Sequence, residues 1–359
     1  MADSKQAPLD AAAAAKAAFA SVQDKPFPND IFTAPELRWA VIGCGVIANQ
    51  MAQSLALAGR KLTGVANRTL TKAQTFADQY GVEKVYDTVE DLYADPDIDA
   101  VYITTPHNTH ITYLRAALAA GKHVLCEKAI TLNSAELDEA RAIAAEHNVV
   151  LMDATTVLHM PLYQELRRRM DAGDFGRMNL AQLNFGSYKE YGDLTNRFYN
   201  RNLAGGAMLD IGVYALSVMR LFMASQPVEV VSLGNTCETG VDVAGGIVCR
   251  NAEQQLGVVS LTLHSKQPKR SVISFDNCYV EVNEYPRADH ATIVWTADGH
   301  REEVAAGTEA YALCYEMADL EQAVAGDDSK RELLDYASDV MELMTKLRAD
   351  WGVVYPEEE

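Results

Sequence analysis

Short apolar runs alternate with longer helical stretches along the first half of the chain. The apolar runs are four or five residues long and partly β-branched, at 39–42, 62–66, 100–104, 123–126 and 149–152, which favours buried strands. The segments between them carry apolar residues at helical spacing, from 49 onward and at 71–80, 89–93, 111–120 and 134–147. This alternation is typical of a doubly wound parallel sheet, which we expect over residues 36–155.

The pattern changes in the second half, residues 156–359. Six candidate strands follow one another without helices between them, at 228–233, 244–250, 255–264, 271–275, 279–283 and 291–295, after an alternating stretch at 180–188. Helices are expected at 162–172, 205–222, 311–325 and 332–347. Consecutive strands indicate an open antiparallel or mixed sheet, so we expect an α+β substrate domain whose last helices pack back on the first domain. We expect one broad face of this sheet to form the subunit interface of a homo-oligomer, a dimer or a tetramer.

Residues 1–35 form a separate N-terminal segment. Residues 11–20 are almost pure alanine, which favours helix, and three prolines between 26 and 35 favour a stiff extended linker. The segment is either a mobile tail or an arm docked on this subunit or a neighbour. Phe19, Phe27, Ile31 and Phe32 are poor choices for a solvated tail.

Residues 38–48, RWAVIGCGVIA, place a glycine turn between the first strand and the first helix. Gly43 allows the tight turn, Gly45 lets a pyrophosphate approach the backbone, and Ala48 lets the helix pack close to the strand. Val46 and Ile47 are expected to contact the cofactor, and the free N–H groups at the start of the helix that follows favour phosphates. We therefore expect a dinucleotide here; the alternative is an ordinary βα turn with two glycines.

The residues after the second strand bear on which dinucleotide binds. NAD-binding chains usually place Asp or Glu there to accept from the ribose hydroxyls. Here Asn67 and Arg68 stand at that place, so no carboxylate repels a 2′-phosphate and a guanidinium is available to pair with one. The sequence favours NADP(H), with NAD(H) as the alternative. Arg68 would otherwise stack on adenine or point into water.

A third loop follows the strand at 100–104, at a carboxyl end where open α/β sheets bind ligands. It reads Thr105, Pro106, His107, Asn108, Thr109 and His110. The two histidines lack a third ligand at metal-binding spacing, so we expect no metal. Packing around the nicotinamide is the favoured role for this loop.

Candidate acid–base chemistry lies at three further residues. Lys128, beside Glu127, follows the strand at 123–126, where a nicotinamide should lie; partial desolvation is expected to lower its pKa so that it exchanges protons near neutral pH. Asp210 and Tyr214 are four residues apart on the helix after Gly205-Gly206, and therefore share one face. The alternatives are a solvated lysine, an aspartate complementing a helix start, and a core tyrosine.

Composition narrows the classes of partner. The formal net charge of −19 argues against nucleic acid and anionic membranes, which favour basic patches. No apolar run reaches the roughly 18 residues that span a bilayer. The six cysteines show no regular spacing, which favours buried free thiols in a reducing compartment and hence a cytoplasmic location.

Four segments together resemble the Gfo/Idh/MocA oxidoreductases, the glucose–fructose oxidoreductase and inositol dehydrogenase family. They are AVIGCGVIA (40–48), TPHNTH (105–110), AGKHVLCEKAITLN (120–133) and LAGGAMLDIGVYAL (203–216). The resemblance implies a two-domain subunit, a nicotinamide cofactor, Lys128 beside the nicotinamide and Asp210 nearby. It also implies a proton donor at Tyr214, as in the glucose–fructose oxidoreductase and trans-dihydrodiol dehydrogenase branches.

On this interpretation the protein moves hydride between NADP(H) and a carbinol or carbonyl carbon of a small polyhydroxylated substrate. Tyr214 exchanges the hydroxyl proton, Lys128 stabilises the oxyanion and lowers the pKa of the tyrosine, and Asp210 orients Lys128. Arg197 is a candidate substrate contact, and His159, Tyr188 and Tyr199 are weaker ones.

The sequence departs from the family at two places. Ala129 replaces the proline that commonly follows Glu-Lys, so the backbone around Lys128 is expected to be less fixed. Residues 155–159 do not match an aromatic-and-arginine segment seen in several members, which leaves the substrate open. The remaining alternatives are a dihydrodiol or anhydro-sugar substrate, a non-catalytic NADP(H)-binding regulator, and an enzyme that holds its cofactor through a full cycle.

Overall fold

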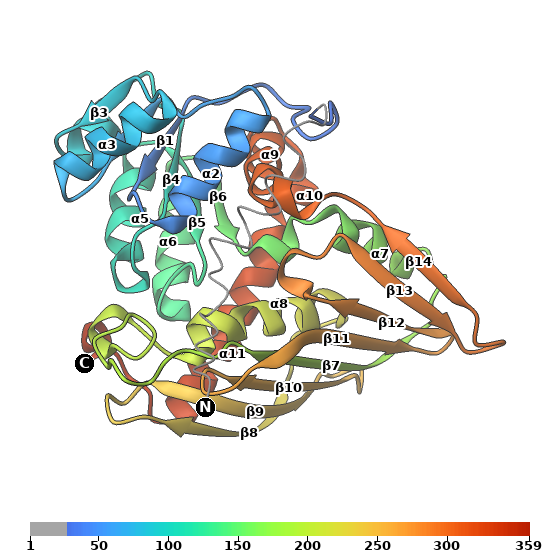
Figure 1. Cartoon of the computed structure of the whole chain (residues 1–359). Coiled ribbons are helices and arrows are strands. Elements are labelled where there is room, and N and C mark those ends of the chain that lie inside the picture. Colours follow the sequence, from blue (N-terminus) through green and yellow to red (C-terminus); the bar gives the residue numbers. More distant parts are fainter. Residues whose placement is uncertain (1–26) are drawn as a thin grey trace, which may run out of the picture.

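Two β-sheets with their helices make up the part of the chain that the computed structural model describes, residues 27–359 (Figure 1). The alanine-rich stretch of the N-terminal segment lies outside the described residues. Residues 27–35 pack against the rest of this chain. The Phe27 ring lies 4.9 Å from that of Tyr311, the Arg60 guanidinium lies 4.0 Å from the Phe32 ring centroid, and Ile31 is buried.

The first sheet is parallel and has the strand order β3-β2-β1-β4-β5-β6. Its strands are β1 (Trp39–Ile42), β2 (Gly64–Ala66), β3 (Lys84–Tyr86), β4 (Ala100–Ile103), β5 (His123–Glu127) and β6 (Leu151–Ala154). Its helices are α2 (Val46–Leu57), α3 (Leu70–Tyr80), α4 (Val89–Ala94), α5 (His110–Ala119) and α6 (Ser134–Glu146). The strand order reverses between β1 and β4, and a crevice at such a point is the usual ligand site of an open α/β sheet.

The second sheet is mixed and has the order β14-β13-β12-β11-β7-β10-β9-β8. Its strands are β7 (Met178–Gly186), β8 (Glu229–Thr236), β9 (Asp242–Arg250), β10 (Leu256–Thr262), β11 (Gln267–Phe275), β12 (Cys278–Asn283), β13 (His290–Trp295) and β14 (Arg301–Ala305). Only β7 and β10 pair in parallel; the other neighbours are antiparallel. The predicted fold class is confirmed, but β3 and β14 were missed. Both are edge strands and lack a fully buried apolar run.

The remaining helices lie over the mixed sheet, between the two sheets or beside the parallel sheet (Figure 1). They are α7 (Pro161–Asp171), α8 (Val213–Phe222), α9 (Ala312–Val324), the short α10 (Asp328–Arg331) and α11 (Leu333–Asp350). Helix α9 belongs to the parallel sheet: its Leu313 and Met317 share a hydrophobic cluster with Val41 of β1. The indole N–H of Trp39 donates to Glu321 at 3.0 Å, which ties α9 to the start of β1.

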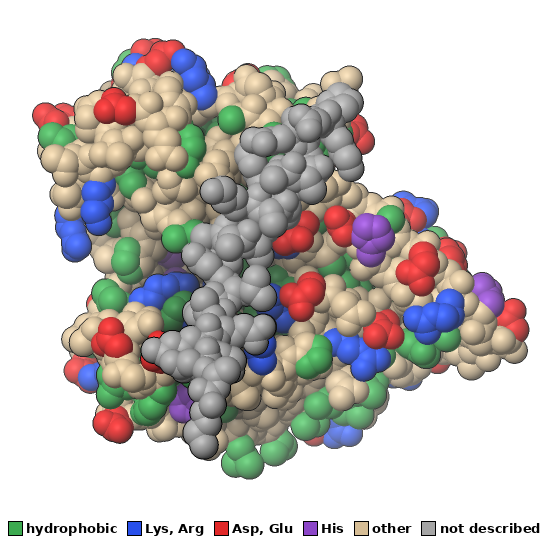
Figure 2. Space-filling view, viewed as in Figure 1, with side chains coloured by type: hydrophobic (Ala, Val, Ile, Leu, Met, Phe, Trp, Pro, Cys, Tyr) green, Lys and Arg blue, Asp and Glu red, His purple; other side chains and the backbone are tan. Residues whose placement is uncertain are grey.

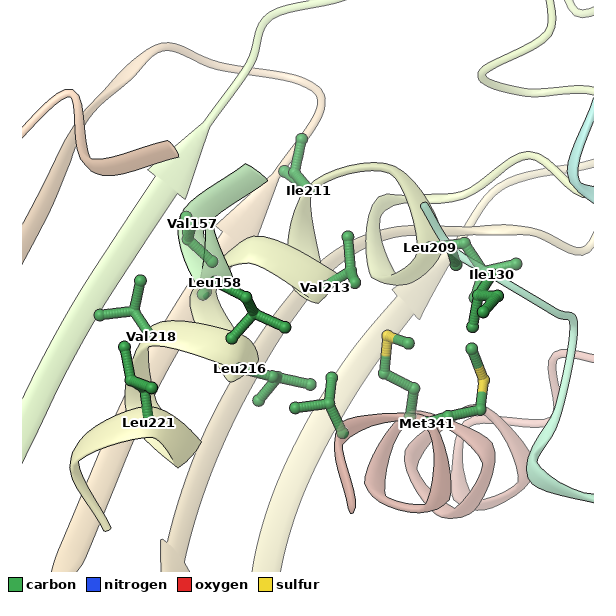
Figure 3. Packing of buried hydrophobic residues seen from close by; sticks show 14 of the residues in the cluster. Ile130, Val157, Leu158, Leu209, Ile211, Val213, Leu216, Val218, Leu221 and Met341 are labelled. Atoms are coloured by element: carbon green, nitrogen blue, oxygen red, sulfur yellow. The ribbon is translucent and has the colours of Figure 1, made fainter. Parts of the chain in front are cut away.

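The buried helical segment at residues 208–222 packs against elements of both halves of the chain. The sequence predicts one helix over 205–222; the structure has a π-helical turn, η4 (Met208–Gly212), that leads directly into α8. Leu209, Val213 and Leu216 of this segment pack towards Ile130 and Met341 (Figure 3). The helical stretch 201–222 is long and apolar enough to cross a membrane. However, 83% of its apolar 18-residue window is buried inside the protein, as expected for a core helix. The burial of η4 and α8 fixes the position of Asp210 and Tyr214.

Candidate active site

The glycine turn after β1 has a backbone that only glycine adopts readily. Gly43 has φ +102°, and a Cβ built there would lie 2.7 Å from Thr104 Oγ1. The Gly43 N–H donates to Ala66 O at 2.9 Å, which ties the turn to the end of β2. Any side chain at this position would therefore strain the turn and collide with the end of β4.

Gly45 and the start of α2 leave open space. A Cβ at Gly45 meets nothing within 4 Å, and Gly45 has an ordinary φ of −77°. No side chain caps α2 and its first turn holds no acidic residue, so its first N–H groups are free among the described residues. Val46 is exposed and Ile47 half-buried beside this space, while Ala48 is fully buried against the sheet. These features fit a pyrophosphate, because open N–H groups at a helix start bind phosphate oxygens.

Asn49 supports the turn, although the sequence pattern did not indicate this role. Its Nδ2 donates to Gly45 O at 2.8 Å, and its Oδ1 accepts from the Tyr80 hydroxyl at 2.8 Å. Tyr80 lies at the end of α3, so this contact joins the glycine turn to the next βα unit. The signal was only an asparagine one turn into a helix, and its partner is distant in sequence.

The end of β2 carries positive charge without a carboxylate. Asn67 donates to its neighbour Thr69 O at 3.0 Å, and Arg68 is exposed. Lys72, in the first turn of α3, acts on the Cys44 thiol beside the glycine turn: burial raises the pKa of that thiol to about 11, and Lys72 opposes the rise. Arg68 and Lys72 therefore make this corner basic, within a chain that is strongly acidic overall.

The side chains of His107 and His110 both contact main-chain carbonyls. The ring of His107 lies between Lys128 O, 3.0 Å from Nε2, and Ala204 O, 3.3 Å from Nδ1. His110 is fully buried between Ala129 O at 3.0 Å and Thr105 O at 2.8 Å. The prediction that His110 contacts the cofactor is wrong, because both of its ring nitrogens face main-chain carbonyls. Burial is also the main reason that the pKa of His107 falls to about 3, which leaves a neutral ring with one N–H.

These two histidines support the backbone that carries Lys128. The peptide bond between Lys128 and Ala129 is cis, and the carbonyls of both residues face the rings of His107 and His110. The expectation of a less fixed backbone, based on the missing proline, is therefore corrected: the support comes from side chains of the loop after β4. The other residues of that loop are Thr105, bonded to Thr109 at 2.9 Å, the exposed Pro106, and Asn108, which donates to Glu357 at 2.7 Å.

Lys128, Asp210 and Tyr214 lie together, at the junction between the two sheets. Lys128 Nζ donates to the main-chain O of Asp210 at 2.7 Å and lies 3.3 Å from its Oδ1. The same ammonium lies 4.8 Å from the centroid of the Tyr214 ring. Arg197 Nη2 lies 3.6 Å from Asp210 Oδ1, so two cations share one carboxylate. Their catalytic roles remain predictions, but the residues are positioned to act on one substrate.

The charge states of this cluster differ in part from the sequence-based expectation. Burial alone would lower the pKa of Lys128, but the adjacent Tyr214 and Asp210 outweigh it and the pKa is raised. The predicted lowering is therefore wrong, and Lys128 stays an ammonium. Burial would raise the pKa of Asp210, but Lys128, Arg197 and Lys189 hold it well below its usual value. Burial raises the pKa of Tyr214, and Lys128 only partly opposes this, so the phenol keeps its proton at neutral pH.

Buried acids lie behind Lys128. Glu127 accepts a hydrogen bond from the Tyr102 hydroxyl, and burial raises the pKa of its carboxyl. Glu316 of α9 is fully buried, and burial together with Glu127 raises its pKa to about 8. The charge of Arg287 acts on both carboxyls and on Tyr214. The sequence offered no signal for Glu316 or Arg287, since each reaches this place from a distant element.

Two residues hold the start of the helix that carries Asp210. Asp242 Oδ2 of β9 accepts from the Met208 N–H at 2.6 Å, and Tyr355 OH donates to Gly205 O at 2.6 Å. Gly206 has φ +125°, and a Cβ there would lie 2.3 Å from Asp242 Oδ1. The glycine pair therefore allows the Asp242 carboxylate to approach the helix start closely.

Two of the weaker substrate-contact predictions are corrected. His159 is fully buried between Asp319 Oδ2, 2.9 Å from Nδ1, and Asp153 O, 2.8 Å from Nε2. Tyr199 is also fully buried and donates to Lys189 O at 2.9 Å. The polar atoms of both side chains form internal hydrogen bonds and are not accessible to a substrate. Tyr188 and Arg197 are exposed and stay candidates.

Family models match most of the described chain. Residues 37–155 match the model described as "Oxidoreductase family, NAD-binding Rossmann fold", and residues 163–281 match "GFO/IDH/MocA C-terminal domain". The first match contains the glycine turn and Lys128, and the second contains Asp210 and Tyr214. The contact between Lys128 and Asp210 therefore joins a residue of one matched domain to a residue of the other.

Similar proteins are named as dehydrogenases and reductases. A trans-1,2-dihydrobenzene-1,2-diol dehydrogenase of Mus musculus is 32% identical over 244 residues, which cover 66% of this chain and 72% of that protein. A 3-ketoreductase from Actinomadura kijaniata, solved with NADP and TDP-benzene, is 25% identical with a TM-score of 0.74, covering 88% of this chain and 98% of that one. A levoglucosan dehydrogenase solved with NADH and levoglucosan shares the fold, with a TM-score of 0.76 at 19% identity, covering 87% and 97%.

The open space at Gly45 yields a direct test of dinucleotide binding. In Gly45→Ala the added methyl group collides with nothing in the protein but occupies the place where a pyrophosphate would approach. We expect the dissociation constant for NADPH, measured by fluorescence titration, to rise about tenfold or more while the melting temperature stays unchanged. Gly246→Ala is the matched control, since its Cβ also meets nothing within 4 Å but lies in the other sheet. Equal NADPH affinity in wild type and Gly45→Ala would contradict a cofactor site at this turn.

Proposed function

This chain belongs to the Gfo/Idh/MocA family of oxidoreductases, and from that premise we propose that it is an NADP(H)-dependent enzyme acting on a carbinol or carbonyl carbon of a small polyhydroxylated molecule. The observation that carries the proposal is the cluster in which Lys128 Nζ contacts Asp210 and lies 4.8 Å from the Tyr214 ring. This cluster brings an ammonium and a protonated phenol together, next to the loops that follow β4 and β5.

The residues divide the chemistry of carbonyl reduction between them. A bound nicotinamide supplies the hydride to the carbonyl carbon, or accepts it in the reverse direction. The Tyr214 hydroxyl donates its proton to the carbonyl oxygen as the alcohol forms. The Lys128 ammonium stabilises the negative charge that develops on that oxygen, and Asp210 keeps Lys128 charged and in place. The pKa of Tyr214 is raised, so the phenol is protonated near neutral pH and the site is suited to reduction there.

The corner at β2 supports NADP(H) as the preferred cofactor. Arg68 and Lys72 supply positive charge there, and Asn67 stands where an NAD-binding chain usually has a carboxylate. The ketoreductase with a TM-score of 0.74 was solved with NADP. NAD(H) is the alternative, since a similar fold was solved with NADH.

Two substrate classes are supported by different observations. The polar cluster and the sugar-related structural neighbours favour a sugar or polyol. The names of the curated relatives favour a trans-dihydrodiol as the second candidate. A non-catalytic role is disfavoured, because Lys128 contacts Asp210 and lies 4.8 Å from the centroid of the Tyr214 ring.

We further propose a homo-oligomer formed through the open face of the second sheet. Val231, Leu233, Val248 and Leu256 are exposed there on three adjacent strands, and Val231 pairs directly with Val248. Contiguous exposed apolar side chains mark association surfaces. Sedimentation at micromolar concentration should show a dimer or tetramer that Leu233→Glu dissociates; a wild-type monomer would contradict the proposal.

The free cysteines support a reducing location such as the cytoplasm.

Loss of the Tyr214 hydroxyl tests the catalytic assignment. A panel of sugars, polyols and a trans-dihydrodiol with NADP+ and NAD+, and of the corresponding ketones with NADPH and NADH, followed by nicotinamide absorbance, would identify a substrate. Tyr214→Phe keeps the ring but removes the proton, so we expect kcat to fall by about 10²–10⁴-fold with the Kd for NADPH within about twofold of wild type. In the wild type, reduction should stay nearly constant between about pH 6 and pH 9 while oxidation rises with pH, because the tyrosine must lose its proton to act as a base.

Tyr336→Phe on α11 is the control, since its ring contacts Arg220 and Arg167 and no reacting group. It should keep wild-type turnover. If Tyr214→Phe retained more than about a tenth of wild-type kcat, the acid–base role of Tyr214 would be wrong. If neither NADPH nor NADH bound the wild type, the proposed function as a whole would fail.

A further inference from the structure

Positive charge gathers around the reactive cluster in an otherwise acidic protein. Lys128 and Arg197 share the Asp210 carboxylate, at 3.3 Å and 3.6 Å. Lys189 and Lys269 lie within electrostatic reach of them: the charges that act most strongly on Lys189 are one carboxylate, Asp210, and three cations, Arg197, Lys128 and Lys269. Basic side chains are visible between the two lobes (Figure 2). Three cations, Lys128, Arg197 and Lys189, therefore act on the Asp210 carboxylate in a chain of net charge −19.

Lys189 is the cation in this group whose charge is least compensated. Its ammonium is half-buried, and among residues 27–359 it has no hydrogen bond to an acceptor and no ion pair. Its nearest recorded partner is the Phe198 ring, whose centroid lies 4.1 Å from Nζ. Burial lowers the pKa of Lys189, and the neighbouring cations lower it further. Such a group is unfavourable unless a ligand brings the missing negative charge.

The loop after β7 is built to hold this ammonium in place. The Lys189 N–H donates to Leu263 O at 2.7 Å, and its carbonyl accepts from the buried Tyr199 hydroxyl at 2.9 Å. Phe198 lies under Lys189 and also under the Arg197 guanidinium, whose Cζ is 4.2 Å from the ring centroid. One aromatic ring thus contacts both cations, and the Lys189 ammonium has its donors left for a ligand.

These cations flank the reacting group and not the cofactor phosphates. Lys269 Nζ lies 5.5 Å from the centroid of the Phe185 ring, and that ring lies 6.1 Å from the Tyr214 ring. Arg197 reaches the same oxygen of Asp210 as Lys128 does. All three of Lys189, Arg197 and Lys269 come from the second half of the chain, whereas the glycine turn and Arg68 belong to the parallel sheet. The three cations are therefore positioned to bind a part of the substrate that is remote from the reacting carbon.

We propose that the substrate carries an anionic oxygen group, a carboxylate or phosphate, which Lys189 and Arg197 bind while Lys128 and Tyr214 act on a carbon further along the same molecule. Lys269, which also pairs with the exposed Glu284 at 2.8 Å, adds long-range attraction. Lys189 is thereby a specificity-determining residue, and neutral sugars are the poorer substrates. This inference rests on the proposed function and narrows its substrate class.

Matched ligand pairs test the inference on the full-length protein, loaded with NADPH when binding is measured and supplied with NADP+ when turnover is measured, because the alcohol carbons of these ligands can only be oxidised. D-gluconate and D-glucitol differ only in a carboxylate, and glucose 6-phosphate and glucose differ only in a phosphate. We expect the wild type to bind or turn over the anionic member of at least one pair about tenfold or more better than the neutral one, an advantage that shrinks at high salt. Lys189→Met should shrink that advantage at least about tenfold, judged as the ratio of the constants for the anionic and neutral members within each variant, so that any effect common to both members cancels. Lys346→Met, which removes an exposed lysine paired with Asp350, should change neither.

Direct anion binding keeps the test independent of turnover. Inorganic phosphate and D-gluconate, titrated by calorimetry into the NADPH-loaded protein, should bind the wild type and the Lys346→Met control alike, and at least tenfold more weakly to Lys189→Met. A preference confined to the phosphate pair or to the carboxylate pair identifies which anion the site takes. Equal binding by wild type and Lys189→Met, or no binding of either probe by the wild type, overturns the inference. NADPH binding, measured first, separates that result from failure of the proposed function itself.

Discussion

The contact between Lys128 and Asp210 is the interaction on which the candidate site depends. Lys128 follows β5 of the parallel sheet, and Asp210 lies in the buried η4 turn of the second half. Their side chains are only 14% and 12% exposed. A charge buried to this degree is costly unless it is paired, and removing one partner typically costs about 3–5 kcal/mol. The pair therefore couples the relative position of the two sheets to the charge state of the site.

The same pair sets the direction of the proton chemistry. Asp210 and Tyr214 keep Lys128 an ammonium, so Lys128 supplies electrostatic stabilisation and Tyr214 supplies the proton. The surroundings hold both groups in place: two histidines support the backbone of Lys128, and Asp242 and Tyr355 hold the helix start ahead of Asp210. Preorganised charge of this kind stabilises a developing oxyanion without reorganisation during the reaction.

Much of the fold and the core of the site could be predicted from sequence, because short-range patterns encode them. The periodicity predicted both sheets, and the spacing of Gly43 and Gly45 predicted the turn that the structure contains. Features that depend on contacts between distant segments could not be predicted. His110 and His159 were assigned to ligand contacts because their partners, main-chain carbonyls and Asp319, are set by tertiary packing. The lowered pKa expected for Lys128 failed for the same reason, since local sequence does not show Asp210 beside it.

A double-mutant cycle in kcat/KM tests most directly whether Lys128 and Asp210 act as one unit across the two sheets. The cycle uses Lys128→Met, Asp210→Asn and the double variant, with cofactor binding measured on each. The account predicts strong non-additivity: the double variant should be about as impaired as the worse single variant, with a coupling free energy of at least about 1.5 kcal/mol. Losses that add to within about 0.5 kcal/mol would show that the two residues act independently and would contradict the account.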